Sequence, residues 1–321
     1  MLKARSSAVL LVIFLLAGSV PVFAWDETGH KITAYIAWQR MTPETRDRVI
    51  RTLLAGPEDS DLGTFFAGYG SRTADTRRRE YFMLIATWAD IIRDKNFNTR
   101  FTKYANSNWH YADTFWKYEN GKSVLVESND ENGLAMKKLH DFDAVIRSSA
   151  SDAEKAVAIA WLEHLIGDIH QPLHTSGKVT DSNPKGDQGG NLFLLTPKGT
   201  PRDKQENLHW FWDSIVVRYS PNVKDQCDAD YLDPIAQEII AKYPYEKMKD
   251  RLQPGKYEAW AKEGLDIAMN DVYKDVKFFE MPSDRYREKA FKIAQERMAL
   301  AGYRMGDLFN EVFGAKTAAS H

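Results

Sequence analysis

Apolar residues recur at helical spacing through most of the chain. Thr42 followed by Pro43 is typical of a helix start, and the apolar residues behind them share one face of a predicted helix over 42–56. A Ser-Asp pair opens a longer, strongly apolar helix predicted over 151–170. Residues 283–313 have the pattern of one long amphipathic helix or a helix pair. We therefore predict a mainly α protein.

Signals for strands are few and short. Residues 122–127 and 191–196 each carry a brief β-type run, so a short β-hairpin is the largest sheet that we expect. Residues 175–190 are rich in Gly, Asp and Asn, which predicts a loop. The basic run at 76–80 indicates a solvated face rather than a binding patch. Because no internal repeat or linker interrupts the pattern, we expect residues 25–321 to form a single multi-helical domain.

The first 24 residues have the pattern of a secretory signal peptide. Lys3 and Arg5 precede an unbroken apolar run from Ala8 to Ala17, which is shorter than the roughly 20 residues needed to span a bilayer. Small residues at the end of the leader favour cleavage between Ala24 and Trp25, although an uncleaved anchor is an alternative. We therefore expect a secreted or periplasmic protein with no stable membrane association after cleavage.

Charge and cysteine content narrow the possible functions. The whole chain has a formal net charge of −2, and loss of two basic leader residues would leave −4. This is not the basic footprint of a protein that holds nucleic acid through backbone charge alone. Phosphate chemistry here would need local positive charge, which a metal cluster can supply. The single Cys227 excludes an intrachain disulfide framework, so stability depends on the core or on metals.

Several of the eight histidines stand close to an aspartate. The pairs are His110 with Asp113, His164 with Asp168, and His209 with Asp213. Residues three or four apart share one face of a helix, so both side chains can reach one ion. Imidazole nitrogen and carboxylate oxygen together are typical zinc ligands. A single such pair is usually a surface hydrogen bond or a satisfied polar pair in the core. Several pairs set among Leu, Ile, Trp and Phe favour a shared metal cluster, because unpaired buried charge is costly.

Two further residues are candidate metal ligands, and one nearby histidine is not. His174 follows in HQPLH, and Asp90 ends TWAD. His170 lies six residues after His164, so it would point to the opposite face of a continuing helix. We expect His170 to be structural rather than a metal ligand.

The quoted motifs resemble a known family, the zinc-dependent single-strand nucleases and 3′-nucleotidases of the S1/P1 type. The matching pieces are WDETGH, WADIIR, WHYAD, HLIGDIHQPLH, GDQGGN, NLHWFWD and AGYRMGDLFNEVF, in the family's order. HLIGDIHQPLH together with NLHWFWD is highly specific, whereas WAD alone is weak. Zinc-dependent bacterial phospholipase C is a distant relative with the same helical fold and a similar metal set.

The resemblance implies three Zn²⁺ ions. One would be held by Asp90, His110, His164 and Asp168. A second would share Asp168 and add His30 and Trp25, the latter through its free α-amino nitrogen and its carbonyl oxygen. The third would be held by His174, His209 and Asp213. A free α-amino group has a pKa of about 8, so zinc can displace its proton.

The resemblance also implies phosphodiester hydrolysis by a hydroxide that bridges the close zinc pair, with a 5′-phosphate product. Asp90 would orient the attacking water, and Arg93 would neutralise charge on the phosphate unless it is an ordinary helix-surface arginine. Tyr111 would stack on a base, Asp113 would bind the base edge, and Asn191 would lie at the mouth of the site. Tyr111 could equally be a core tyrosine.

These residues leave three functions open. The first is a monomeric endonuclease acting on single-stranded DNA, RNA and 3′-nucleotides. The second is a phospholipase C that cleaves lipid headgroup phosphodiesters with the same metals. The third is a secreted helical protein with structural zinc only. The third is disfavoured because structural zinc sites are closed, whereas Trp25, His30 and Asp168 leave room for water.

Overall fold

The computed structural model describes residues 25–66, 68, 72–127 and 133–315. The predicted leader and the cleavage point after Ala24 lie outside these residues. No helix in the described ranges is both long enough and apolar enough to cross a membrane.

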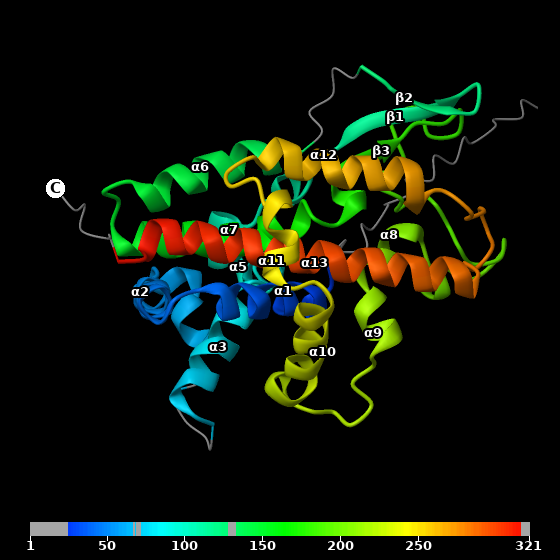
Figure 1. The fold of residues 1–321 in the computed structure, drawn as a ribbon. Coiled ribbons are helices and arrows are strands. Elements are labelled where there is room, and N and C mark those ends of the chain that lie inside the picture. The colour runs from blue at the N-terminus through cyan, green and yellow to red at the C-terminus, as the bar shows by residue number, and fades with distance from the viewer. Residues whose placement is uncertain (1–24, 67, 69–71, 128–132, 316–321) are drawn as a thin grey trace, which may run out of the picture.

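The fold is mainly α, as predicted, with one small sheet (Figure 1). In the described part of the chain, the α-helices are α1 (Glu27–Arg40), α2 (Pro43–Leu54), α3 (Ala74–Ile85), α4 (Trp88–Ile91), α5 (Asn98–Tyr104), α6 (Ala135–Arg147), α7 (Asp152–Asp168), α8 (Leu208–Asp213), α9 (Ile215–Tyr219), α10 (Asp228–Lys242), α11 (Tyr245–Met248), α12 (Tyr257–Ile267) and α13 (Asp284–Phe313). Three short 3₁₀ or π segments matter below: η3 (Ser107–His110), η4 (Pro172–His174) and η7 (Ala268–Val272).

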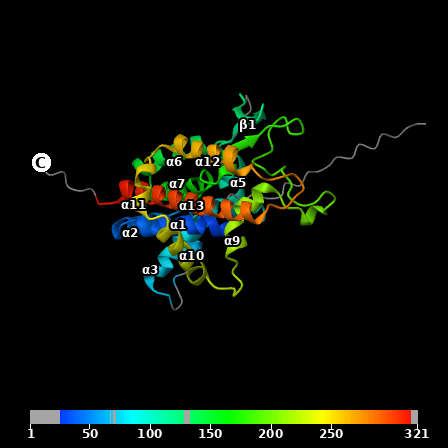
Figure 2. The same ribbon diagram turned by 45° about the vertical axis from the view of Figure 1, so that its right-hand side comes forward.

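The long helix α13 runs through the middle of the molecule, with α1 on one side and α6 and α12 on the other (Figures 1 and 2). Two glycines allow α1 and α13 to approach closely. A Cβ atom at Gly302 would lie 2.5 Å from Ile36 Cβ, and one at Gly306 would lie 2.7 Å from Arg40 Cβ. Both distances are shorter than real contacts allow, so this helix pair requires glycine at both positions.

Helix α7 lies at the centre of the fold. Ser151 and Glu154 form a reciprocal capping box at its start, as the Ser-Asp opening predicted for a helix start. Its second half is buried on every side, including His164 and Asp168, which is typical of a helix that crosses a protein core. The helix ends at Asp168, two residues before the predicted end, so His170 lies in the turn beyond it.

The other predicted helices are confirmed with small changes. Thr42 caps α2 with its side chain, and Pro43 is the first helical residue. The region 283–313 is one continuous helix rather than a pair. The basic run at 76–80 lies on α3, where Arg78 is half-exposed and pairs with Asp47. Arg79 differs from the prediction of a solvated face, because it is largely buried against Asp233.

The strand predictions are partly wrong. β1 (Thr114–Glu119) and β2 (Lys122–Leu125) form the expected hairpin, although β1 itself was not predicted. β3 (Ser176–Lys178) pairs in parallel with β1, inside the region predicted as a loop. Residues 191–196 are not a strand: they make only a single bridge between Leu194 and Asn207. Gly189 and Gly190 have positive φ, and the turn that they form engages the N–H groups of Asn191, Leu192 and Phe193 with carbonyls of residues 187–190 instead.

Candidate metal centre

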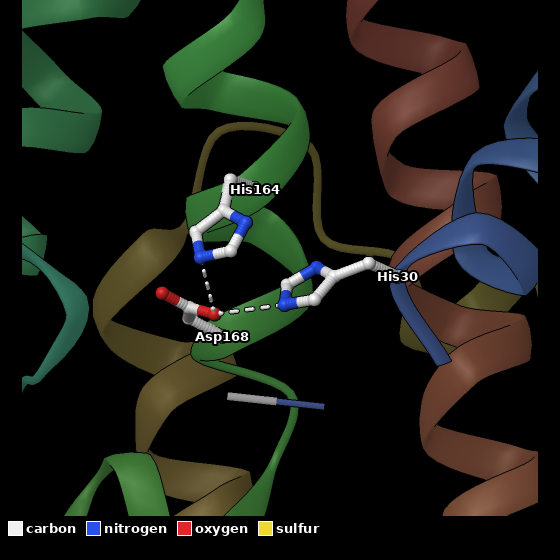
Figure 3. Close-up of side chains that lie close together, drawn as sticks. All are labelled: His30, His164 and Asp168. Atoms are coloured by element: carbon white, nitrogen blue, oxygen red, sulfur yellow. Dashed lines mark ion pairs between the residues drawn. The ribbon is translucent and has the colours of Figure 1, made fainter. Parts of the chain in front are cut away.

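The end of α7 brings the first group of metal-ligating side chains together. Asp168 Oδ1 lies 3.4 Å from His164 Nε2, one turn earlier on the same helix. It lies equally close, 3.4 Å, to Nε2 of His30, which α1 contributes. Figure 3 shows both ring nitrogens pointing at the same carboxylate oxygen. The sequence pair His164–Asp168 therefore acts with a histidine from far away in the chain.

A second group shares His164 and adds residues from α4 and η3. His110 Nδ1 lies 2.9 Å from His164 Nε2 and 3.1 Å from Asp168 Oδ2. Asp90 Oδ2 lies 3.8 Å from His164 Nε2. Asp90, His110 and His164 can together hold one ion, and His30, His164 and Asp168 another. Since the two groups share His164, two ions bound here would be close neighbours.

A third group forms between η4 and α8. His174 Nε2 lies 3.1 Å from His209 Nε2, and His209 Nε2 lies 3.3 Å from Asp213 Oδ2. These three residues can also hold an ion. The other carboxylate oxygen, Asp213 Oδ1, accepts a hydrogen bond of 2.7 Å from Gln171 Nε2, which fixes the carboxylate plane.

Backbone carbonyls set the orientation of three of the histidine rings. His164 Nδ1 lies 2.8 Å from Ala86 O, His174 Nδ1 lies 2.8 Å from His110 O, and His209 Nδ1 lies 2.6 Å from Gly189 O. A carbonyl only accepts, so each neutral ring donates from Nδ1 and presents the lone pair of Nε2. Two such lone pairs facing each other, as in His174 and His209, are stable when a cation lies between them.

The electrostatics of the centre also call for cations. Except for the partly buried Asp90, all the histidines and aspartates of the three groups are buried. Among the described residues, both ring nitrogens of His30, Asp168 Oδ1 and Asp213 Oδ2 lack a hydrogen-bond partner. Burial raises the pKa of the Asp168 and Asp213 carboxyls well above the ordinary value and lowers the pKa of His30 well below it. Buried carboxylates without a cation are strongly unfavourable, and a divalent ion with nitrogen and oxygen ligands removes that cost.

Sequence reasoning missed the residues that make room for the ligands. A Cβ atom at Gly167 would lie 2.7 Å from His30 Nδ1. At Gly189, where φ is +59°, a Cβ atom would lie 2.3 Å from Leu173 O. Gln171 was also missed, although it lies inside HQPLH. The motifs contained all three residues, but only the fold shows what they contact.

The residues expected to bind substrate lie around the centre, but one predicted metal-binding pair does not form. The Tyr111 ring stacks on His174, with centroids 4.7 Å apart and an interplanar angle of 23°. Asp113 does not share a metal with His110, because η3 ends at His110 and the chain continues extended. The spacing argument fails for this pair. Asp113 Oδ1 is instead buried and has no hydrogen-bond partner among the described residues. Burial, and then the negative charge of Asp187, raise the pKa of the Asp113 carboxyl well above its ordinary value.

Arg93 and Asn191 lie beside the metal groups rather than in them. Arg93 Nη1 donates to Asp90 Oδ1 over 3.3 Å, so its charge adjoins the second group. Asn191 is partly buried, and its Nδ2 donates to Gln188 O over 2.8 Å within the turn that contains Gly189 and Gly190.

The start of the described chain is tied to the centre. Trp25 is fully buried, and the backbone N–H of Asp26 donates to Asp213 O over 3.0 Å. His170 points elsewhere, as expected. Its Nδ1 lies 2.7 Å from Ile166 O, and its Nε2 accepts from Arg304 Nη1 over 2.7 Å.

Comparison with known proteins gives a consistent result. Residues 25–314 match the sequence model of the S1/P1 Nuclease family. Endonuclease 2 of Arabidopsis thaliana is 22% identical, over 95% of this chain and 96% of its own length. Nuclease S1 of Aspergillus oryzae is 23% identical, over 88% and 90%. Nuclease P1 of Penicillium citrinum is 25% identical, over 60% of this chain and 58% of its own length.

Proposed function

The chain belongs to the S1/P1 nuclease family and is a hydrolase of phosphodiester bonds, and we propose that it is a zinc-dependent endonuclease of single-stranded DNA and RNA. We assign it an associated 3′-nucleotidase activity and 5′-phosphate products. The observation that carries this proposal is the set of three His/Asp groups whose possible ligand atoms converge, and among the described residues both ring nitrogens of His30, Asp168 Oδ1 and Asp213 Oδ2 lack a hydrogen-bond partner.

We assign three Zn²⁺ ions to these groups. In the family's arrangement, Asp90, His110, His164 and Asp168 would hold one ion, and His30, Asp168 and the α-amino and carbonyl groups of Trp25 a second. The geometry also places His164 in one group with His30 and Asp168. His174, His209 and Asp213 would hold the third ion. Bound zinc would lower the pKa of water and offset negative charge on the phosphate. The chain's own residues supply the orientation: Ala86, His110 and Gly189 carbonyls fix three rings, and Gln171 fixes Asp213.

Two residues would act directly on the reacting groups. Asp90 lies beside His164, which the first two metal groups share, and it is less buried than Asp168. Its carboxylate can therefore orient an attacking water. Arg93, held by Asp90, would place a guanidinium beside the phosphate as its negative charge grows. The hydrogen bond to Asp90 also limits where the guanidinium can move.

Tyr111 and Asp113 would select the substrate. Tyr111 is partly buried and its ring stacks on His174, next to the third metal group, and an aromatic ring at this position suits stacking on an unpaired base. The buried oxygen of Asp113 could bind the base edge, and Asn191 would line the mouth. A base held in a duplex cannot reach such a platform, which favours single strands. We expect the enzyme to act as a monomer, in the periplasm or outside the cell.

One side-by-side assay tests the proposal. The mature protein beginning at Trp25 is purified, its zinc is counted, and it is given single-stranded DNA, RNA, duplex DNA, 3′-AMP and phosphatidylcholine. We expect three zinc ions and cleavage of the first two substrates and 3′-AMP in preference to duplex DNA. Cleavage of the lipid with none of nucleic acid would replace the nuclease by a phospholipase C. Zinc without hydrolysis of any substrate would indicate a structural role.

A further inference from the structure

An exposed tyrosine at the small sheet is held in one orientation by its neighbours. The Tyr118 side chain is 45% exposed, yet its hydroxyl donates to Met269 O of η7 over 3.2 Å. Its ring meets the Trp116 ring edge to face, with centroids 5.1 Å apart. An exposed aromatic ring that cannot rotate away is a preformed surface for stacking.

A lysine with unusual surroundings lies beside this ring. Lys178 Nζ is 4.8 Å from the centroid of Tyr118 and 4.7 Å from that of Tyr273. It is 5.6 Å from the centroid of Trp116 and 6.0 Å from that of Phe193. Within the described residues no carboxylate lies within ion-pair distance of this ammonium, unlike Lys117, which pairs with Glu119. The charge of Lys178 is therefore positioned by rings and is not neutralised by a direct ion pair.

Tyr118 and Lys178 line one hollow in the surface, together with Lys117, Thr180 and Asp181. The backbone around the hollow is fixed as well. Lys178 pairs with Trp116 in the parallel register of β1 and β3, and its backbone N–H donates to Asp187 Oδ1 over 2.9 Å. The hollow is thus formed by ordered strands and by a ring cluster.

The same two strands connect this hollow to the metal centre. Next to the ligands, Ala112 N donates to His174 O over 2.8 Å, and Thr114 N donates to Thr175 O over 3.1 Å. β1 and β3 then run in parallel away from the centre. Tyr118 lies seven positions after Tyr111, so their backbones are at most about 25 Å apart, which a few nucleotides can span.

We propose that Tyr118 and Lys178 form a second nucleotide subsite, in which the Tyr118 ring stacks on a base and the Lys178 ammonium binds a phosphate of the same strand. The ligand is a single-stranded oligonucleotide whose cleaved bond lies at the metal centre, so the inference rests on the proposed nuclease function. A nucleotide offers both a π face and a negative charge, which are the two features that this hollow complements. Substrates too short to reach the hollow gain nothing from it.

Substrate length gives the test. The zinc-loaded enzyme is compared with Tyr118→Leu and Lys178→Met on a dinucleotide and on a single strand of about twelve nucleotides. Lys178→Met keeps the aliphatic stem among the rings. We expect each variant to lose about tenfold in kcat/KM on the long strand, through KM, and to cleave the dinucleotide at the wild-type rate. Lys178→Met should also reduce the salt dependence of kcat/KM on the long strand by about 0.7 in the log–log slope.

The same chain offers a matched control for each of the two substitutions. Tyr219 is 37% exposed and belongs to α9, a helix on the far side of α13 from the sheet (Figures 1 and 2). Lys249 is a surface lysine paired with Glu246. Tyr219→Leu and Lys249→Met should leave both substrates unaffected. Equal losses on both substrates, or no loss on the long strand, would overturn the subsite. A wild-type enzyme that cleaves neither substrate would instead refute the proposed function.

Discussion

Gly167 is the residue on which the position of His30 depends most directly. In Gly167→Ala the new Cβ atom would lie 2.7 Å from His30 Nδ1 and would push the ring away from Asp168. Helix propensity alone favours alanine inside α7 by about 1 kcal/mol, so any loss must come from this clash. We expect the affinity for one zinc ion to fall about 10- to 100-fold, measured by competition with a chelator.

The control for this change is Gly63→Ala, because a Cβ atom there meets nothing within 4 Å. It should leave zinc binding unchanged. If Gly167→Ala binds all its zinc as tightly as the wild type, His30 is not a ligand or moves without cost.

The second prediction for a single residue concerns the α-amino group of Trp25. Trp25 is buried, and the next N–H binds the carbonyl of Asp213. An extra Met before Trp25 would convert the amine to an amide, which cannot offer a lone pair to zinc. We expect the extended protein to bind one zinc ion fewer and to lose most of its activity.

The best comparison is one polypeptide before and after removal of a short extension by a protease that leaves Trp25 first. Zinc stoichiometry and nuclease activity should both rise on cleavage. Full zinc content and activity before cleavage would show that the N-terminal amine is not a ligand.

Among the secondary-structure elements, the turn between α7 and η4 has an anchor of its own on α13. His170 Nε2 accepts from Arg304, and the His170 carbonyl accepts from Arg297 Nε over 3.1 Å. Glu263 on α12 pairs with both arginines. The turn continues into Gln171 and His174, so this buried network holds the third metal group against the longest helix.

His170→Leu tests the anchor. It leaves Arg304 with one buried partner fewer, so we expect the free energy of unfolding to fall by about 1–3 kcal/mol. We also expect weaker zinc binding at the group of His174, His209 and Asp213, with the other two ions retained. Stability is measured by urea unfolding, and zinc by stepwise chelation.

His170→Gln should recover part of the loss, because a glutamine oxygen can still accept from Arg304. The matched control is His140→Leu, since His140 is exposed and pairs with Glu258 on the surface. A stable His170→Leu protein with normal zinc binding would show that the turn needs no anchor.

The sequence predicted those features of the secondary structure that depend on contacts between residues close together in the chain. Helix starts were predictable because Thr42 and Ser151 cap backbone groups only three residues away. The pair His164–Asp168 was predictable for the same local reason. The parallel pairing of β3 with β1 joins segments about 60 residues apart and leaves no periodic signal in three residues. The contacts of Gly167 with His30 and of Gln171 with Asp213 are equally non-local, and motif resemblance indicated the ligands but not their supports.

In the whole molecule, the ligands come from parts of the chain that are far apart in sequence, from His30 near the start to Asp213. Ions bound here would therefore link α1, α4, η3, α7, η4 and α8 in the folded state only. An ion that binds only the folded state stabilises it by about 2.7 kcal/mol when its free concentration is 100 times Kd. Because unfolding of a chain of this size has an entropy of about 0.6 kcal/mol/K, chelation should lower Tm by roughly 4–5 °C for each such ion.

The size of this shift should depend on pH in a defined direction. Burial raises the pKa of Asp168 and Asp213, so without metal the folded protein keeps protons that the unfolded chain loses above pH of about 4. That linkage makes the metal-free fold lose stability as pH rises toward the raised pKa. Burial lowers the pKa of His30 and His110, so the metal-free fold also loses stability as pH falls below about 6.5.

Zinc must displace the carboxyl protons, so its affinity and its contribution to stability increase with pH. We therefore expect chelation to lower Tm more at pH 8 than at pH 5.5, measured by calorimetry with and without chelator. Added Zn²⁺ should restore Tm, whereas Mg²⁺, which prefers oxygen ligands in an octahedron, should not. A chelator effect that is absent, or larger at the lower pH, would mean that the buried carboxylates do not hold the ions. If the effect is absent, the three groups are a polar core without metal, and the proposed zinc-dependent mechanism loses its physical basis.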